Sequence, residues 1–179
     1  MGQNYVGLDL STKTGFVRLD EQGNVLEANE ITLKDLEDPE RMSLIAEKIL
    51  SEIQPTDFVL IEGFSFNSSG RSVDFQYGIG WFIRVHLYRR GMKFVVVAPS
   101  QLKKFATGKG VGDKAAVAVG ISERFGFKHK SDNVRDAYVL AQIGRAINGH
   151  GQLIKTQKEV VEAILNPKPK AKAKAKNKA

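Results

Sequence analysis

Apolar and polar positions repeat with two different periods along the first 166 residues, and the two periods predict strands and helices. Short, nearly continuous apolar runs bounded by turn residues are typical of buried strands. Longer segments in which apolar residues recur every three or four positions are typical of amphipathic helices. The expected strands cover 5–10, 15–20, 25–33, 58–62 and 93–98, and the expected helices cover 38–53, 72–90, 99–105, 113–125 and 131–147.

The order of these elements predicts the fold class. Three strands come first, and the first long polar turn, 20–24, is typical of a hairpin between antiparallel strands. Helices and strands then alternate, an order that favours parallel strands with helices on both faces. We therefore predict an α/β domain with a mixed five-stranded sheet, three strands antiparallel and the later strands parallel.

The last segment differs in composition from the domain that precedes it. Residues 167–179 contain six lysines, no acidic residue and an alternation of Lys with Ala that has no apolar stripe to bury. Such a segment is expected to be disordered. We therefore predict a folded domain over 1–166 and a basic tail over 167–179. The tail could add salt-sensitive affinity for nucleic acid, or it could only increase solubility.

Several protein classes are excluded by composition. Cysteine is absent from the 179 residues, which rules out disulfides, thiolate nucleophiles and cysteine-bound metals. No run of 18 apolar residues is present, so we expect no membrane-spanning segment. The first ten residues lack the basic and apolar regions of a secretory signal. We expect a cytoplasmic protein with no membrane partner.

The net charge of +7 is unevenly distributed along the chain. Residues 1–83 carry 6 basic and 14 acidic side chains, whereas residues 84–130 carry 11 basic and 2 acidic side chains. Residues 131–166 are balanced. A basic middle segment together with a basic tail predicts a polyanionic partner such as nucleic acid.

Four carboxylates stand in apolar strands or on a partly apolar helix face. Asp9 lies inside the first expected strand, and Glu62 ends the fourth. Asp132 and Asp136 are four residues apart in the last long helix, so both lie on one face of it. A carboxylate near a buried sheet is unfavourable unless it is paired, hydrogen-bonded or bound to a metal.

Each of these acids also has an ordinary structural explanation. Asp9 could brace the turn that follows it, and Glu62 could simply end a strand. Asp132 could cap the last helix, and Asp136 could pair with a basic side chain. The four together favour a metal site, and oxygen ligands favour Mg²⁺, with Mn²⁺ as a substitute. We expect two ions per site, one activating water and one stabilising the leaving oxygen of a phosphoryl transfer.

Four segments carry a pattern seen in one family. They are VGLDLSTKTG at 6–15, VLIEGF at 59–64, the stretch from 95 to 114 with its strand, helix and Gly-Lys-Gly loop, and SDNVRDA at 131–137. They resemble the RuvC family of Holliday-junction resolvases, within the ribonuclease H-like superfamily. The matching parts are that family's first strand with its catalytic Asp, the strand that ends in its catalytic Glu, its basic DNA-binding stretch and its C-terminal acidic motif.

The resemblance covers about residues 4–148 and implies both a fold and an activity. It implies a ribonuclease H-like domain that nicks four-way DNA junctions symmetrically, with Mg²⁺, no nucleotide cofactor and the four carboxylates as catalytic and metal-binding residues. It also implies a homodimer, because two active sites are needed to cut two strands across a two-fold junction. The helix over 72–90 is the candidate interface, although an ordinary core helix explains its pattern equally well.

One spacing departs from the common form of the family. There the last two acids are three residues apart, and here that position is Asn133 while the acid is Asp132. Both spacings reach one helix face, so Asp132 can serve as the ligand. The variant looks closest to the bacteriophage branch, which implies a phage-encoded protein in the bacterial cytoplasm.

Aromatic and basic residues near these motifs are candidates for DNA contacts. Aromatics in the loop after Glu62 could wedge between or stack on bases, or they could be core residues. Lysines near the glycine-rich loop could bind phosphates, or they could face solvent. The predicted DNA-binding residues are Phe64, Phe66, Arg71, Lys103, Lys104, Lys109 and Lys114.

Three other function classes share part of this pattern. An actin-like or sugar-kinase-like phosphotransferase shares a loop similar to 9–15 but needs a second domain to enclose its nucleotide. A non-catalytic junction-binding protein would gain nothing from carboxylates that face phosphates. A ribonuclease H-like nuclease acting on an RNA/DNA hybrid, a flap or a strand end shares the same chemistry and is the principal alternative.

Overall fold

The computed structural model describes residues 2–64, 73–110 and 114–167, which form one sheet surrounded by helices. The strands are β1 (Tyr5–Asp9), β2 (Lys13–Leu19), β3 (Val25–Thr32), β4 (Phe58–Glu62) and β5 (Phe94–Val97). The helices are α1 (Glu40–Glu52), α2 (Val73–Arg89), α3 (Pro99–Thr107), α4 (Lys114–Phe125), α5 (Asp132–Ile147) and α6 (Lys155–Leu165). None of these helices is long and apolar enough to cross a lipid bilayer.

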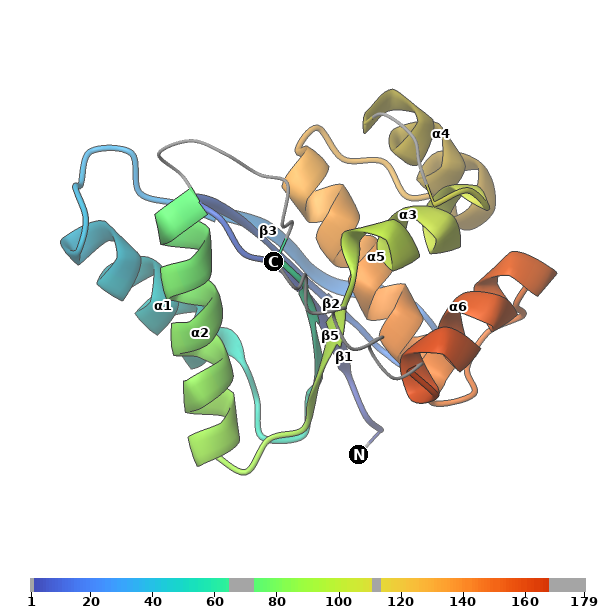
Figure 1. Cartoon of the computed structure of the whole chain (residues 1–179), viewed down its shortest axis with the longest axis horizontal. Helices are drawn as coiled ribbons and strands as arrows, with labels where there is room; N and C mark the ends of the chain where they lie inside the picture. Colours follow the sequence, from blue (N-terminus) through green and yellow to red (C-terminus); the bar gives the residue numbers. More distant parts are fainter. Residues whose placement is uncertain (1, 65–72, 111–113, 168–179) are drawn as a thin grey trace, which may run out of the picture.

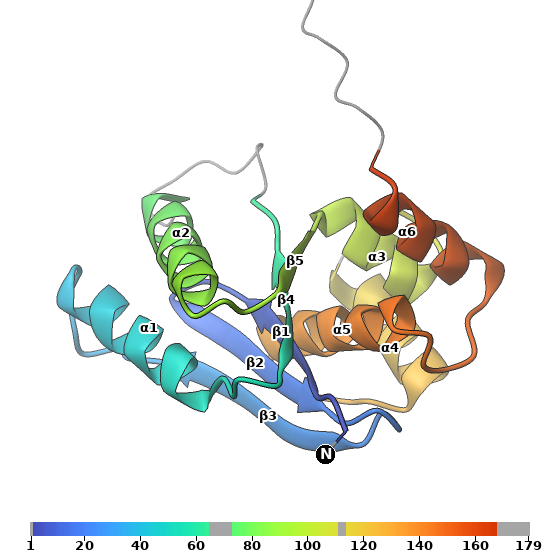
Figure 2. The ribbon, with the colours of Figure 1, turned by 90° about the horizontal axis from the view of Figure 1, so that it is seen from below.

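The sheet has the mixed topology that the order of elements predicts. The sheet lies between the helices in Figure 1, and its strand order, β3-β2-β1-β4-β5, can be followed in Figure 2. β1 is antiparallel to β2, and β2 is antiparallel to β3. β1 is parallel to β4, and β4 is parallel to β5. β1 is therefore central, and the sheet changes from antiparallel to parallel at this strand.

Helices cover both faces of the sheet, as predicted (Figure 2). α1 and α2 cover one face, and α5 covers the other, with α3, α4 and α6 packed around it. Side chains of a strand alternate between the faces. Val6 and Leu8 of β1 accordingly lie in the core beneath α1 and α2, whereas Tyr5 lies in the core with α5. Asp9 has the same parity as Tyr5, so its side chain is on the α5 face.

Two glycines allow α5 to lie unusually close to the sheet. A Cβ atom on Gly7 of β1 would stand 1.9 Å from the carbonyl oxygen of Ala137. A Cβ atom on Gly15 of β2 would stand 2.0 Å from the carbonyl oxygen of Asn133. Gly15 is the partner of Asp9 in the β1–β2 ladder. The close approach therefore brings the first turns of α5 to the end of β1 that carries the acid.

One helix, α6, was not predicted from the sequence. Its N-terminus lacks a Ser, Thr, Asp or Asn cap, and the Gln157 side chain instead accepts a hydrogen bond from the Ile154 amide at 3.1 Å. α6 packs against α3 through the buried side chains of Gln157 and Val160. The other predicted elements are present, with ends that differ by a few residues. The predicted disordered tail lies outside the described residues, except for Pro167.

Candidate metal centre and its cavity

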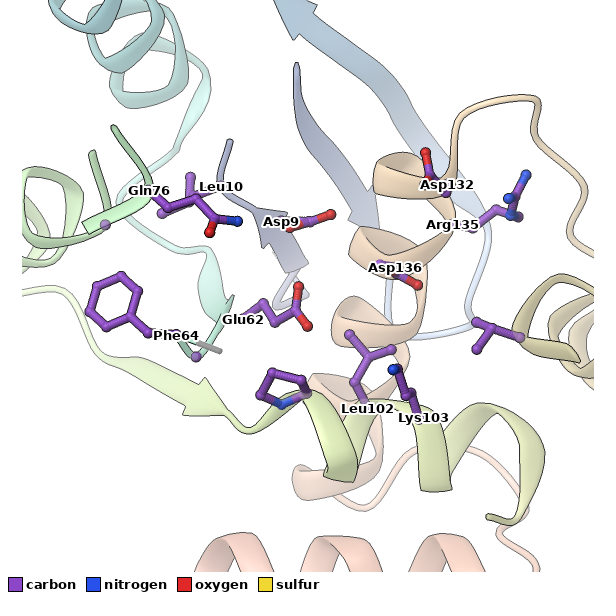
Figure 3. A pocket seen from close by; sticks show the side chains of 14 residues that line it. Asp9, Leu10, Glu62, Phe64, Gln76, Leu102, Lys103, Asp132, Arg135 and Asp136 are labelled. Atoms are coloured by element: carbon purple, nitrogen blue, oxygen red, sulfur yellow. The ribbon is translucent and has the colours of Figure 1, made fainter. Parts of the chain in front are cut away.

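Two acidic side chains end the two neighbouring parallel strands at the centre of the sheet. The β1–β4 register sets Leu8 beside Ile61, so the next residues along the chain, Asp9 and Glu62, stand side by side. Figure 3 shows both carboxylates directed toward α5. In open α/β sheets, ligands bind at the carboxyl ends of the strands. These two acids therefore lie at the edge of the sheet where ligands bind in folds of this kind.

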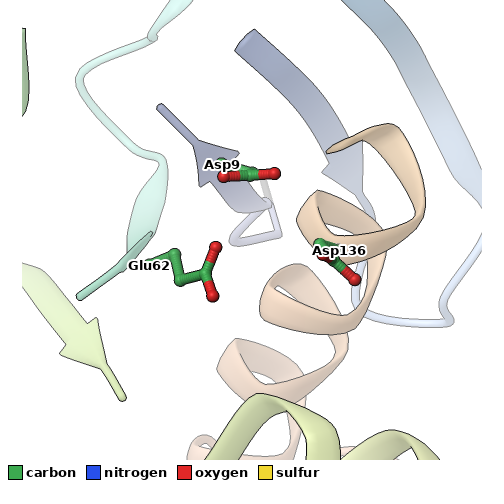
Figure 4. Close-up of side chains that lie close together, drawn as sticks. All are labelled: Asp9, Glu62 and Asp136. Atoms are coloured by element: carbon green, nitrogen blue, oxygen red, sulfur yellow. The ribbon is translucent and has the colours of Figure 1, made fainter. Parts of the chain in front are cut away.

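α5 supplies the third carboxylate of the cluster. One carboxylate oxygen from each of Asp9, Glu62 and Asp136 lies within 4.8 Å of the other two (Figure 4). Asp9 is only 7% exposed, and the other two side chains are half-buried. Three oxygen donors that converge in this way fit a hard divalent cation such as Mg²⁺.

The electrostatics of the cluster also favour a bound cation. Burial is the largest cause that raises the pKa of Asp9 well above its ordinary value, and the negative charges of Glu62, Asp136 and Asp132 raise it further. Burial also raises the pKa of Glu62, against the opposing effects of its hydrogen bond with Asp9 and of the Lys103 charge. A divalent cation at this place would relieve the repulsion and allow both carboxylates to ionise.

The turn after Asp9 is closed by other residues. The Thr14 hydroxyl accepts a hydrogen bond from the Ser11 amide at 3.2 Å and donates one to the Ser11 carbonyl at 2.8 Å. The Ser11 hydroxyl in turn accepts from the Lys13 amide at 3.1 Å. These contacts brace the turn, and the Asp9 carboxylate instead forms a hydrogen bond with Glu62.

The first turn of α5 gives Asp132 and Asn133 different environments. Ser131 caps this helix, with its side chain accepting from the Val134 amide at 3.4 Å, so the explanation of Asp132 as the N-cap is wrong. The Asn133 side chain donates to the carbonyl of Lys13 at 2.6 Å and thereby ties α5 to β2. Asp132 lines the same cavity as the clustered acids, although the group within 4.8 Å does not include it.

A cavity of about 440 Å³ surrounds the carboxylates (Figure 3). Helix α2 contributes Gln76 and Gly80 to its wall, α3 contributes Leu102 and Lys103, and α5 contributes Arg135. Gln76 and Arg135 were not among the site residues predicted from the sequence. Arg135 could have been suspected because it is adjacent to Asp136 in the sequence. For Gln76 the sequence gives no such indication, because apolar periodicity does not show which polar side chains of a helix border a cavity.

The predicted DNA-binding lysines have different surroundings. Lys103 lines the cavity, whereas Lys104 pairs with Glu159 of α6 at 2.7 Å. Lys109 is exposed beyond the end of α3. The described part of the chain does not include Phe66, Arg71 or the side chain of Lys114.

Phe64 lines the cavity wall, and its ring contacts two side chains of α2. The ring of Tyr77 stacks on it, with centroids 4.3 Å apart. The guanidinium carbon of Arg84 lies over it, 4.3 Å from the ring centroid. The alternative that Phe64 is a packed residue is therefore the one that these contacts favour.

Comparison with known proteins supports the fold assignment. No family model and no curated protein matches the sequence. Thermus thermophilus RuvC has a similar structure, with a TM-score of 0.61 and 20% identity over 78% of this chain and 91% of that chain. T. thermophilus RuvC in complex with a Holliday junction substrate gives a TM-score of 0.58 and 19% identity, over 78% and 90%. The chain thus has the RuvC-like ribonuclease H fold, and the resemblance predicted from the sequence is confirmed at the level of the fold.

Proposed function

We propose that this protein is a metal-dependent endonuclease that cuts four-way (Holliday) or branched DNA junctions. The observation that carries the proposal is the convergence of Asp9, Glu62 and Asp136 within 4.8 Å at the centre of a RuvC-like sheet. One structural neighbour was solved with a Holliday junction substrate. A basic segment beside the acids supplies charges that suit a polyanion.

The residues at the site fit Mg²⁺, with Mn²⁺ as a substitute. Asp9, Glu62 and Asp136 would hold one ion, and Asp132, on the same cavity wall, would complete the site for a second. When bound, such ions activate a water molecule and stabilise the leaving 3′-oxygen of a phosphodiester. With the carboxylates holding the ions, the reaction would need no protein nucleophile, which agrees with the absence of cysteine.

Lys103 is the basic side chain best placed to act on the scissile phosphate. It lines the cavity, and its charge lowers the pKa of Glu62, so it lies within electrostatic reach of the acids. A phosphate between the acids and this lysine would bring its own negative charge toward the ammonium group. We assign Lys103 the role of holding the substrate phosphate at the metal centre.

The wider DNA surface would be formed by the other predicted residues. Lys104 lies on α3, and Lys109 follows the end of this helix. Phe66 and Arg71 fall in the sequence between Glu62 and α2, and Lys114 is the first residue of α4. The basic members, Arg71, Lys104, Lys109 and Lys114, would contact phosphates on the arms of a junction and contribute salt-dependent affinity. Phe66 stays a candidate for stacking on bases, whereas the Phe64 ring packs against α2.

Symmetric nicking requires a homodimer, and α2 offers a surface for it. Four large apolar side chains of this helix are exposed, with Tyr88 at 79% and Trp81 at 58%. The other two, Phe82 and Val85, are both 41% exposed. Contact between two copies of α2 around a two-fold axis would bury these side chains and give one dimer two active sites.

The proposal can be tested with labelled substrates. The full chain is incubated with an immobile four-way junction, a flap, a linear duplex and an RNA/DNA hybrid, each in Mg²⁺ and in EDTA. We expect paired nicks in the junction that require Mg²⁺, and Asp9→Asn should bind the junction without cutting it. Efficient cutting of the hybrid or the flap with the junction left intact would favour the alternative substrates. Junction binding without cutting in any divalent metal would favour a non-catalytic protein.

A further inference from the structure

Two residues after Glu62, the proposed metal ligand, the side chain of Phe64 packs against helix α2. The ring of Phe64 lies on Gly80, at a point where α2 has no side chain. A Cβ atom on Gly80 would stand 2.6 Å from Cε1 and 2.8 Å from Cζ of this ring. Contacts below 3.0 Å essentially never occur for a real Cβ atom, so the ring occupies the space that any other residue at position 80 would need.

Two side chains of α2 form the walls of this slot. Tyr77 stacks on the Phe64 ring, and the Arg84 guanidinium carbon lies over the same ring, each 4.3 Å from the ring centroid. Trp81 stands beside them, 6.4 Å from the Phe64 ring and 5.4 Å from the Arg84 guanidinium carbon. The slot, formed by Tyr77, Gly80 and Arg84, therefore contacts the ring through three residues of one helix.

Arg84 shows that the slot is costly to build. Its side chain belongs to a residue only 9% exposed, and its Nε and Nη2 atoms have no hydrogen-bond partner within the part of the chain that the structure describes. Burial accordingly lowers the pKa of the guanidinium. A buried cation without hydrogen bonds on that edge is unfavourable, and stacking on the Phe64 and Trp81 rings offsets part of the cost.

We propose that the slot is a positioning device for the metal centre, with Phe64 as the positioning residue for Glu62. This inference rests on the proposed metal site. Glu62 is the last residue of β4, and the following Gly63 is held by a hydrogen bond from its amide to the carbonyl of Val97 at 2.7 Å. With Phe64 clamped on α2, the backbone is anchored on both sides of the Glu62 side chain, which limits where its carboxylate can lie relative to Asp9.

The proposed effect is one of packing, because the Phe64 ring is held by its contacts with Tyr77, Gly80 and Arg84 of α2. Consequently, a change that displaces the ring without altering any charge should weaken the metal site.

Gly80→Ala is such a change, and Gly78→Ala is its matched control on the same helix. Alanine favours a helix more than glycine does, so neither change should lower helix stability by itself. At position 78 the new Cβ would meet Cε of Met42 at 2.8 Å and Sδ at 3.1 Å, the flexible end of a side chain that can move away. At position 80 it would meet a ring that Tyr77 and Arg84 hold in place.

Mn²⁺ binding to the full chain without DNA, measured by calorimetry, tests the proposal apart from activity. We expect Gly80→Ala to weaken Mn²⁺ binding by about tenfold or more, the range seen when supporting groups of a metal site are removed. Gly78→Ala and Tyr77→Phe, which keeps the stacked ring, should bind Mn²⁺ like the wild type. The emission of Trp81, the only tryptophan, should change in Gly80→Ala because the adjacent ring moves.

Wild-type Mn²⁺ affinity in Gly80→Ala would overturn the inference, whatever the emission of Trp81. If Gly80→Ala does not fold, Phe64→Leu removes the stacked ring without adding volume and should weaken Mn²⁺ binding in the same way. Other results would refute the proposed function and not the role of the slot. If the wild type binds no Mn²⁺, the proposed metal site is wrong. If Mn²⁺ binds and its affinity depends on the slot, but junctions are not cut, only the substrate assignment is refuted.

Discussion

The side-chain amide of Asn133 donates a hydrogen bond to the backbone carbonyl of Lys13 across 2.6 Å. This contact fixes the rotation of α5 over the β1–β2 turn. Asn133 thereby points to the sheet, and its neighbour Asp132 lines the cavity at the carboxylate cluster. Asn133 thus has a structural partner, and this supports our proposal that Asp132 is the fourth acid of the site.

Separate substitutions of Asp132 and Asn133 should affect catalysis and stability differently. Asp132→Asn should lower junction cutting by at least about tenfold with unchanged folding, because it removes a proposed metal ligand. Asn133→Ala should lower the free energy of unfolding by about 0.5–1.5 kcal/mol, because it removes the hydrogen bond to Lys13. Cutting rates and urea denaturation of both variants check this. Unchanged cutting by Asp132→Asn would exclude it as a ligand.

The metal-free protein should lose stability as the pH rises. The pKa of Asp9 is raised in the folded state by burial and by its acidic neighbours, whereas in the unfolded chain it is about 3.9. The folded state therefore retains a proton that the unfolded state releases. This stabilising contribution is complete below about pH 4 and is lost as the pH rises through the folded-state pKa.

Denaturation in EDTA between about pH 5 and pH 8 measures this effect. We expect the free energy of unfolding to fall with pH in the wild type and to fall less in Asp9→Asn, which should be the more stable protein at the upper end. Mg²⁺ should restore stability to the wild type only. A wild type whose stability rises with pH over this range would contradict the raised pKa.

The distance between α5 and the sheet should be essential for the site. Gly7→Ala would place a Cβ atom 1.9 Å from the Ala137 carbonyl and 2.8 Å from the Ala141 amide. We expect it to lower the free energy of unfolding by about 1–3 kcal/mol, the usual cost of overpacking, and to displace Asp136. Gly110→Ala, whose Cβ would be 3.8 Å from its nearest neighbour, is the control. Thermal unfolding and Mn²⁺ binding are measured for both variants. Only Gly7→Ala should lose stability and metal affinity, and a Gly7→Ala variant that behaves like Gly110→Ala would contradict the prediction.

Removing the acid that pairs with Lys104 should strengthen DNA binding. Lys104 and Glu159 form an exposed pair at 2.7 Å, and such pairs contribute little to stability. Glu159→Gln should therefore leave unfolding nearly unchanged and increase junction affinity severalfold, because a lysine becomes available to phosphates. Lys104→Gln should decrease the affinity. Fluorescence anisotropy with a labelled junction measures both, and equal affinities would remove Lys104 from the DNA surface.

The lysine-rich tail should contribute affinity that depends on salt. Deleting residues 167–179 removes six lysines. For each phosphate that the tail neutralises on duplex arms, the deletion should reduce the slope of log K against log salt by about 0.9. Junction affinity should therefore fall more at low salt than at high salt. An unchanged slope would show that the tail does not bind DNA.

Local patterns were sufficient for most of the elements and failed where long-range contacts decide. The strands of the sheet and helices α1 to α5 follow from apolar periodicity, because burial of one face requires that period. α6 was missed because it starts without a conventional cap and gains its stability from packing on α3. Phe64 shows the same limit, because its choice between stacking on a base and packing on α2 depends on Gly80, sixteen positions away in the chain.

The sequence by itself determined which chemistry the protein can carry. Acids at Asp9 and Glu62 inside apolar strands, and at Asp132 and Asp136 on one helix face, indicate a cation site, because isolated buried carboxylates are unfavourable. Only the tertiary structure decided which of these carboxylates lie close to one another. The β1–β4 register sets Asp9 beside Glu62, and Gly7 and Gly15 let α5 bring Asp136 to them. These distances depend on contacts between segments far apart in the chain, which no local periodicity encodes.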